Sequence, residues 1–172
     1  LDFALVRSAN QPPSPKLAVP RSSTPREQRI YLDGPIQFST RDEYRYHENL
    51  VHPLLSIPGA RKNVLVLGGG DGLAAREILK YDDVEHIHLV DIDPEMIRIG
   101  TELPILKRLN EKSMSSERLT AFSEDAFSFI NQPGILYDRV IIDMPDPHNE
   151  AINKLYSREF YTMIKRRMTP EG

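Results

Sequence analysis

The chain has 172 residues, of which 40% are hydrophobic, so it is long enough for one ordinary domain with a buried core. Its net charge of −3 argues against nucleic acid as the main partner, and the basic run 165–167 is interpreted as a solvated helix face. The absence of cysteine excludes disulfides, zinc–thiolate sites and thiol nucleophiles, and fits a reducing, cytoplasmic compartment. There is no recognisable signal peptide, and no run of about 18 apolar residues that could span a membrane.

The first third of the chain is predicted to hold two small elements. Residues 1–28 carry five prolines, at 12, 13, 15, 20 and 25, and are interpreted as a leader or linker with one edge strand at Phe3–Val6. Residues 29–59 are predicted to form a β-hairpin around Asp33-Gly34, followed by a connecting helix over residues 42–50 that Pro53 ends.

Residues 60–172 show a different pattern, in which short apolar runs alternate with helical patterns. The expected strands are 63–67, 86–91, 118–122 and 138–143. The expected helices are 72–80, 94–100 and 126–130. This alternation predicts an α/β fold, a Rossmann-like doubly wound parallel sheet of the kind found in class I S-adenosylmethionine-dependent methyltransferases. The turn that ends at Gly172 indicates a C-terminally incomplete domain, and the start at Leu1 suggests a fragment.

A glycine-rich loop follows the first of these strands. Gly68, Gly69, Gly70 and Gly72 lie between a strand and a helix, where glycines let a backbone approach a ligand. Asp91 ends the second strand about twenty residues later, where a carboxylate can accept both hydroxyls of a ribose. The alternative is that Asp91 caps the next helix, although Asp93, directly before Pro94, suits that role better.

Asp71 stands inside the glycine loop, where its charge would oppose a pyrophosphate and would suit a cation. A sulfonium nucleoside such as S-adenosylmethionine has ribose and adenine, no phosphate, and an ammonium group in its tail. The loop therefore favours that class of ligand over NAD. After the third strand, Asp125 is placed either to accept from an adenine amine or to cap a helix, and spacing alone leaves both readings open.

Two carboxylates, Asp143 and Asp146, follow the fourth strand on a loop stiffened by Pro145 and Pro147. Neighbouring carboxylates repel each other and favour a cation between them. The cation is either a divalent metal, for which only His148 and Asn149 follow as further ligands, or an alkyl amine. A solvent-exposed acidic turn is the remaining alternative.

Several motifs together resemble the spermidine synthases, the aminopropyltransferases of polyamine biosynthesis. YLDGPIQFSTRDEYRYHE resembles their entry motif, LGGGDG their nucleotide loop, VDID their ribose segment, EDA their adenine segment and DMPDP their gate loop. The resemblance runs from about Tyr31 to Tyr161. DMPDPHNEAINKLYS is similar to a subgroup fused to membrane segments, which would place a membrane portion outside this chain.

The resemblance implies aminopropyl transfer from decarboxylated S-adenosylmethionine to a diamine such as putrescine, with methylthioadenosine released. In this reading Asp143 deprotonates the attacking amine, Tyr46 orients it, and Asp146 lies beside it. Gln37 touches the nucleoside, and His47 helps to hold the aminopropyl donor.

The resemblance also implies that Asp71 binds the donor's ammonium, Asp91 the ribose and Asp125 the adenine, while Tyr156 lies where a loop closes over the site. No metal and no permanently bound cofactor are expected, and the partners are small molecules within a homodimer or higher homo-oligomer. Met144 and Pro145 replace the small hydroxyl residues usual in the gate loop, which leaves the acceptor amine open. A small-molecule methyltransferase and a non-catalytic nucleoside- or polyamine-binding domain are the alternative functions.

Overall fold

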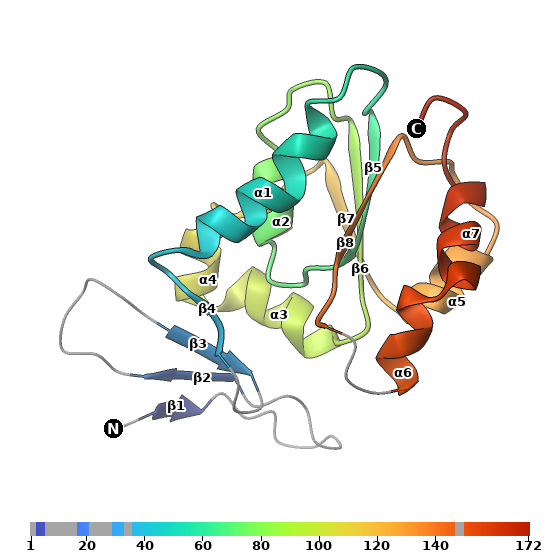
Figure 1. Ribbon diagram of the computed structural model, residues 1–172. Coiled ribbons are helices and arrows are strands. Elements are labelled where there is room, and N and C mark those ends of the chain that lie inside the picture. The colour runs from blue at the N-terminus through green and yellow to red at the C-terminus, as the bar shows by residue number, and fades with distance from the viewer. Residues whose placement is uncertain (1–2, 6–16, 21–28, 33–35, 147–149) are drawn as a thin grey trace. The chain divides into compact units, whose positions relative to one another are not determined.

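The computed structural model, drawn in Figure 1, describes residues 3–5, 17–20, 29–32, 36–146 and 150–172. The chain forms two compact units, Leu1–Glu48 and Asn49–Gly172, and the division falls inside helix α1 (Glu43–Leu55). The domain boundaries expected from the sequence, after residues 28 and 59, stay a prediction.

The N-terminal unit contains a four-stranded antiparallel sheet in the order β1-β2-β3-β4. Its strands are β1 (Phe3–Leu5), β2 (Leu17–Pro20), β3 (Arg29–Leu32) and β4 (Ile36–Ser39). The antiparallel pairing of β3 with β4 confirms the hairpin, whose turn at Asp33-Gly34 lies outside the described residues. The strand expected near Phe3 is present, whereas β2 was not expected, because its apolar run is short and ends in a proline.

Helix α1 corrects one sequence expectation. Pro53 lies inside the helix, which continues to Leu55, so the prediction that this proline ends it is wrong. A proline inside a helix removes one N–H donor and its ring crowds the preceding turn, so other contacts must compensate. The last turn is kept by Val51 and Leu55, which have no exposed surface, and by a 2.9 Å hydrogen bond from the Ser56 N–H to the His52 carbonyl.

The C-terminal unit is built on a parallel sheet in the order β7-β6-β5-β8. Its strands are β5 (Asn63–Gly68), β6 (His86–Asp91), β7 (Leu119–Ser123) and β8 (Arg139–Asp143). In Figure 1 helices cover both faces, with α2, α3 and α4 on one side of the sheet and α5, α6 and α7 on the other. The predicted doubly wound α/β sheet is therefore confirmed.

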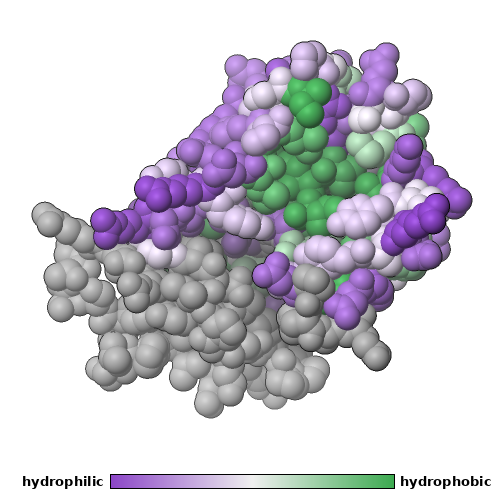
Figure 2. Space-filling model, viewed as in Figure 1, coloured by the Kyte–Doolittle hydropathy of each residue, from purple (hydrophilic) through white to green (hydrophobic). Residues whose placement is uncertain are grey.

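Two apolar clusters form the core, one on each face of this sheet. Successive residues of β5 point to opposite faces, so Val64 and Val66 belong to one cluster while Leu65 and Leu67 belong to the other. All four side chains are fully buried, as expected for a strand that is covered on both sides. Apolar side chains also gather on the face drawn in Figure 2, between α1 and α7, where the edge strand β8 lies.

The predicted helices are present as α2 (Leu73–Ile78), α3 (Pro94–Glu102) and α5 (Ala126–Asn131). The structure adds α4 (Pro104–Leu109), α6 (Glu150–Asn153), α7 (Arg158–Arg166) and the 3₁₀ turns η1 (Ser113–Ser115) and η2 (Lys154–Tyr156). Within the part of the chain that the structure describes, none of the helices has the length and apolar character needed to cross a bilayer.

The basic run at the end of α7 is a solvated face only in part. Lys165 and Arg166 are exposed as expected, but the guanidinium of Arg167 folds back onto the carbonyl oxygens of Ile135 and Gln132. That part of the expectation is wrong, because Arg167 closes the C-terminal end of α5 instead of facing water.

Candidate active site

The carboxyl ends of the parallel strands gather the predicted acidic residues at one edge of the sheet. Gly68, the last residue of β5, pairs with Asp143 of β8, and Asp91 of β6 pairs with Ser123 of β7. The strand order reverses at β5, whose neighbours are β6 and β8. Ligands of open α/β sheets bind at such a switch point, outside the carboxyl ends of the strands.

Glycines let the loop after β5 pass close to Asp143. A Cβ atom on Gly68 would lie 1.9 Å from the Asp143 carbonyl oxygen, and the φ of 89° at this residue also favours glycine. At Gly69 a Cβ atom would lie 3.0 Å from the Asp143 carboxylate. The loop backbone therefore runs directly beside this carboxylate.

Asp71 lies at the start of α2, half-buried, and its carboxylate accepts a 2.9 Å hydrogen bond from the Leu73 N–H. A carboxylate oxygen of Asp71 and one of Asp143 lie within 4.8 Å of each other. Two like charges at this separation favour a cation between them. The geometry suits a cation such as an ammonium group.

Asn110 and Ser113, which the sequence analysis did not identify, form hydrogen bonds to the glycine loop. The Asn110 side-chain amide donates to the carbonyl oxygens of Asp71 and Gly100, both at 2.8 Å, and the Ser113 hydroxyl donates to the Gly72 carbonyl at 2.6 Å. A Cβ atom on Gly100 would lie only 2.3 Å from the Gly70 carbonyl oxygen. No motif spacing marks Asn110 or Ser113, and their polar character inside a buried region was the one available signal.

Asp91 braces the glycine loop. Its two carboxylate oxygens accept from the N–H groups of Gly70 and Asp93, both at 2.9 Å. Burial raises the pKa of Asp91, and the neighbouring charges of Asp93 and Asp143 add to this, whereas the two N–H donors oppose it. Asp93 caps α3 through the Glu95 N–H, so Asp91 is not the helix cap, and its remaining lone pairs can accept from a ribose.

Asp125 caps α5, the alternative that its sequence position left open. One oxygen accepts from the N–H and the hydroxyl of Ser128, at 2.9 and 3.0 Å, and the other lies 3.4 Å from the Lys154 ammonium. Burial acts to raise the pKa of Asp125, but the bonds from Ser128 and the charge of Lys154 outweigh it and lower this pKa. Contact with adenine stays a prediction for this residue.

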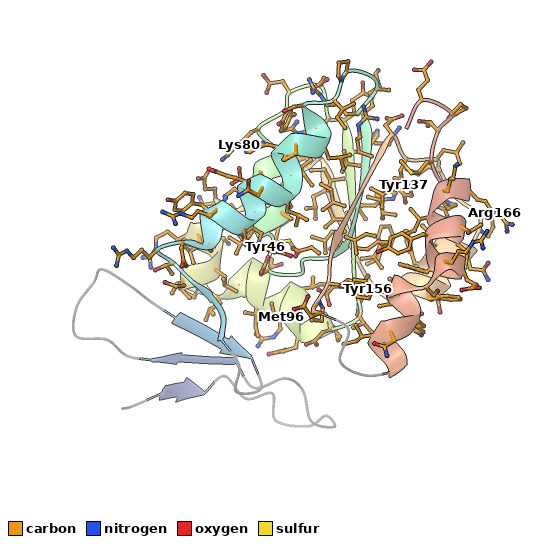
Figure 3. The ribbon with its side chains drawn as sticks, in the orientation of Figure 1. Tyr46, Lys80, Met96, Tyr137, Tyr156 and Arg166 are labelled. Carbon is orange, nitrogen blue, oxygen red and sulfur yellow. The ribbon has the colours of Figure 1, made fainter. Side chains whose placement is uncertain are left out.

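The loop after β8 carries Met144, Pro145 and Asp146, and it lies beside the side chain of Tyr156 (Figure 3). The Tyr156 hydroxyl lies 2.9 Å from the Pro145 carbonyl oxygen and 3.3 Å from that of Met144. Burial raises the pKa of this hydroxyl, helped by Asp146, Tyr161 and Asp143, so it stays protonated and can donate. The expected further ligands His148 and Asn149 lie outside the described residues, as does Pro147.

Three predicted site residues belong to the N-terminal unit. Gln37 lies on β4, and its side chain is outside the described part. Tyr46 and His47 lie on α1 with their rings edge to face, 5.0 Å between centroids, and His47 Nδ1 lies 3.0 Å from the Glu43 carboxylate. Their roles toward a substrate stay predictions.

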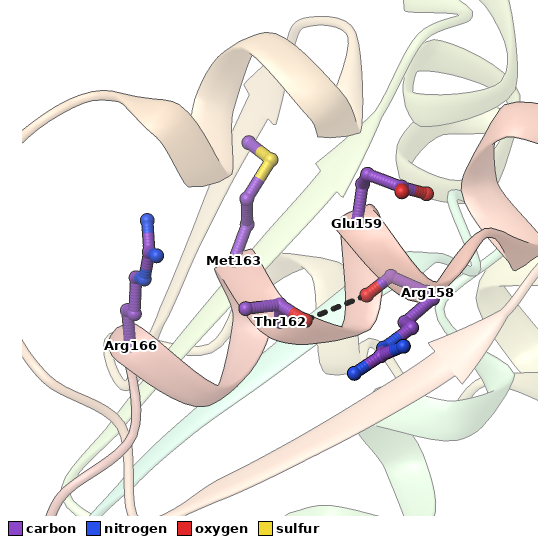
Figure 4. A pocket seen from close by; sticks show the side chains of 5 residues that line it. All are labelled: Arg158, Glu159, Thr162, Met163 and Arg166. Carbon is purple, nitrogen blue, oxygen red and sulfur yellow. Dashed lines mark hydrogen bonds between the residues drawn. The ribbon is translucent and has the colours of Figure 1, made fainter.

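A hollow on the surface of α7 contains none of the predicted site residues. It is lined by Arg158, Glu159, Thr162, Met163 and Arg166 (Figure 4). The Thr162 hydroxyl donates to the Arg158 carbonyl at 2.8 Å, which is a bond within the helix. We therefore assign the functional site to the carboxyl edge of the sheet and not to this hollow.

The fold and this edge define a Rossmann-like α/β domain with a glycine-rich loop and an acidic ligand edge. Residues 43–172 match the spermine/spermidine synthase domain. The chain is 46% identical over 144 residues to a polyamine aminopropyltransferase of Oceanobacillus iheyensis and 50% identical over 142 residues to one of Leptospira interrogans. These alignments cover 84% and 83% of this chain.

Solved structures agree with these relatives. The chain resembles a spermidine synthase in complex with the transition-state analogue AdoDATO, with a TM-score of 0.83 and 26% identity over 96% of this chain. It also resembles the spermidine synthase of Thermotoga maritima, with a TM-score of 0.80. The chain belongs to the spermine/spermidine synthase family, and the resemblance seen in the sequence is confirmed.

The chain is shorter than the proteins it matches. The alignments span 28% of the length of both curated relatives and 55% of the spermidine synthase chain solved with AdoDATO. The activity, the substrates and the partners of the whole protein are therefore matters of proposal.

Proposed function

We propose that this protein is a polyamine aminopropyltransferase, which transfers the aminopropyl group of decarboxylated S-adenosylmethionine to a diamine such as putrescine. The observation that carries the proposal is the approach of Asp71 and Asp143 within 4.8 Å, across the glycine loop. Both substrates are cationic and carry no phosphate, so an acidic edge suits them. Family membership and the names of the relatives support the same activity.

The reaction is an in-line displacement. The lone pair of the amine nitrogen forms a bond to the methylene carbon next to the sulfonium, and the carbon–sulfur bond breaks with its electrons moving to sulfur. Methylthioadenosine leaves as a neutral thioether. A free alkyl amine has a pKa of about 10, so a base must take its proton, and Asp143 fills this role while Tyr46 orients the amine.

The remaining aspartates select and hold the donor. Asp71 attracts the ammonium of the decarboxylated donor and repels the carboxylate of ordinary S-adenosylmethionine. Asp91 accepts from the ribose hydroxyls, and Asp125 accepts from the adenine amine with the lone pairs that Ser128 and Lys154 leave. Gln37 and His47 contact the nucleoside and the aminopropyl tail, and Asp146 supports the amine beside Asp143.

The donor is a co-substrate, and no step of this mechanism uses a metal or a permanently bound cofactor. The proposal includes a homodimer or higher homo-oligomer, a cytoplasmic location and a membrane portion outside this chain. The acceptor amine is open, because Met144 packs against the apolar cluster of the α5–α7 face where the family usually has a small hydroxyl residue.

The test is release of methylthioadenosine by the full-length protein with decarboxylated S-adenosylmethionine and putrescine. We expect turnover with this donor and little with S-adenosylmethionine. Methyl transfer from S-adenosylmethionine would instead identify a methyltransferase. Tight binding of both substrates without product, for putrescine and for longer amines, would identify a binding domain.

A further inference from the structure

One short turn contacts the loops of both edge strands. β7 and β8 are the outer strands of the parallel sheet, with β6 and β5 between them. Three strand spacings separate them by about 14 Å. The turn η2 nevertheless reaches both loops, since Lys154 lies 3.4 Å from Asp125 after β7 and Tyr156 lies 2.9 Å from the Pro145 carbonyl after β8.

The base of this turn is fixed by the core. Leu155, between the two contacting residues, packs against the apolar cluster of the α5–α7 face. Ser157 directly after it caps α7 by accepting from the Phe160 N–H at 3.2 Å, and Phe160 has no exposed surface. The side chains of Lys154 and Tyr156 therefore extend from a well-anchored point.

The Tyr156 hydroxyl holds the backbone between the two carboxylates of the gate loop. Its acceptors are the carbonyls of Met144 and Pro145, which lie between Asp143 and Asp146 in the chain. A carbonyl contact of this kind recognises no side chain, but it fixes the path of the loop. Loss of the hydroxyl would leave the loop backbone free to shift, and the carboxylates would shift with it.

Lys154 connects η2 to Asp125, the residue that is proposed to contact adenine. Its ammonium lies 3.4 Å from the Asp125 carboxylate and 5.6 Å from the centroid of the Phe127 ring. Asp125 uses its other oxygen to cap α5. A nucleoside that binds at Asp125 would therefore lie near η2, which also contacts the loop after β8.

We propose that η2 is a positioning element that couples two loops, the one after β8, which would hold the amine, and the one after β7, which would hold the nucleoside. Tyr156 acts on the first loop and Lys154 on the second. The inference rests on the proposed function for the identity of the two ligands. Neither residue needs to touch the reacting atoms. Binding of the nucleoside would then strengthen binding of the amine through the shared turn.

The experiment measures putrescine binding by calorimetry with and without methylthioadenosine, in the full-length protein. We expect methylthioadenosine to tighten putrescine binding, and this ratio to fall toward one in both Tyr156→Phe and Lys154→Met. The double variant should show no more than the larger single effect, as expected for residues that act through one element. In turnover, Tyr156→Phe should raise the KM for putrescine roughly fivefold to tenfold, the scale of one or two lost hydrogen bonds. Because coupling between two ligands is reciprocal, the apparent affinity for the donor at saturating putrescine should fall as well.

The matched control is Lys165→Met, which makes the same chemical change as Lys154→Met at an exposed position of α7. A wild-type ratio of one, or a ratio that both variants leave intact, would overturn the coupling. A fall in the thermal midpoint with equal losses for both ligands would show a structural role only. Binding with coupling but without turnover would refute the proposed function alone, and a wild-type protein that binds neither ligand would refute both.

Discussion

Charged side chains are arranged differently at the amino end and at the carboxyl end of the parallel sheet. At the amino end, Arg61 pairs with Asp83 at 2.7 Å and Lys62 pairs with Glu85 at 2.6 Å. The half-buried Arg118 has neutral partners instead, because its guanidinium donates to backbone carbonyl oxygens. Charges at this end are matched by groups that the fold itself supplies.

At the carboxyl end, carboxylates face one another. Asp71 and Asp143 approach within 4.8 Å, and the charges of Asp93 and Asp143 help to raise the pKa of Asp91. Such an arrangement costs folding free energy, since like charges repel and burial disfavours each charged form. The difference teaches that charged pairs of the fold support the amino end, whereas the carboxyl end brings several carboxylates together where the proposed cationic substrates would bind.

The largest effect is expected for Asp143→Asn. Loss of the general base should lower the rate of methylthioadenosine release at least about a hundredfold, with little change in the thermal midpoint. The matched control is Asp83→Asn at the amino end, which removes an exposed pair and should leave the rate unchanged. Equal rates for Asp143→Asn and the wild type would show that Asp143 is not the general base.

The second effect belongs to the amino end and is one of stability. Arg118→Met removes donors to the carbonyls of Leu79, Tyr81 and Val84, and should lower the free energy of unfolding by about 1–3 kcal/mol. Urea unfolding measures this, and the turnover rate of the folded protein should not change. A loss of turnover without a loss of stability would contradict the view that Arg118 contributes to stability alone.

A smaller effect is expected in donor selection. Asp71→Asn should reduce the preference for decarboxylated S-adenosylmethionine over S-adenosylmethionine by about tenfold, because the carboxylate that repels the second donor is gone. Calorimetry with both donors gives the ratio directly. If the ratio of the two donor affinities stays at the wild-type value, a group other than Asp71 discriminates between the two donors.

The smallest effect is a pH dependence at Asp91. Its pKa is raised in the folded protein, so on acidification the folded state takes up this proton before the unfolded chain does. The contribution of Asp91 to the free energy of unfolding should therefore become more favourable as pH falls through the raised pKa, while nucleoside affinity weakens because protonation removes an acceptor.

Urea unfolding and calorimetry with methylthioadenosine, both as a function of pH, check these opposite trends. In Asp143→Asn the midpoint of the affinity change should move to lower pH, because one neighbouring charge that raises this pKa is removed. A midpoint that does not move would contradict the electrostatic link between the two residues.

Most of the fold followed from local pattern. The four parallel strands are short apolar runs, and their topology brings Asp71, Asp91, Asp125 and Asp143 to one edge without any knowledge of side-chain contacts. The error at Pro53 arose because buried contacts of Val51 and Leu55 outweigh the cost of a proline near a helix end.

What the sequence could not show are contacts between distant segments. The bonds from Asn110 and Ser113 to the glycine loop join residues that are 39 and 41 positions apart from their partners. The bond from Tyr156 to backbone carbonyls depends on loop geometry and has no signature in residue type. Asp125 could not be assigned from spacing because a helix cap and a ligand contact require the same residue at the same place.

Helix α3 packs directly on the glycine loop, since a Cβ atom added to Gly100 would lie 2.3 Å from the Gly70 carbonyl oxygen. We expect a displacement of the loop on nucleoside binding to shift α3 as well, and the outer surface of this helix carries the ion pairs of Arg98 with Glu95 and Glu102. A spectroscopic probe attached on that outer surface would therefore report ligand arrival at a distance from the chemistry, without disturbing any acidic group of the edge.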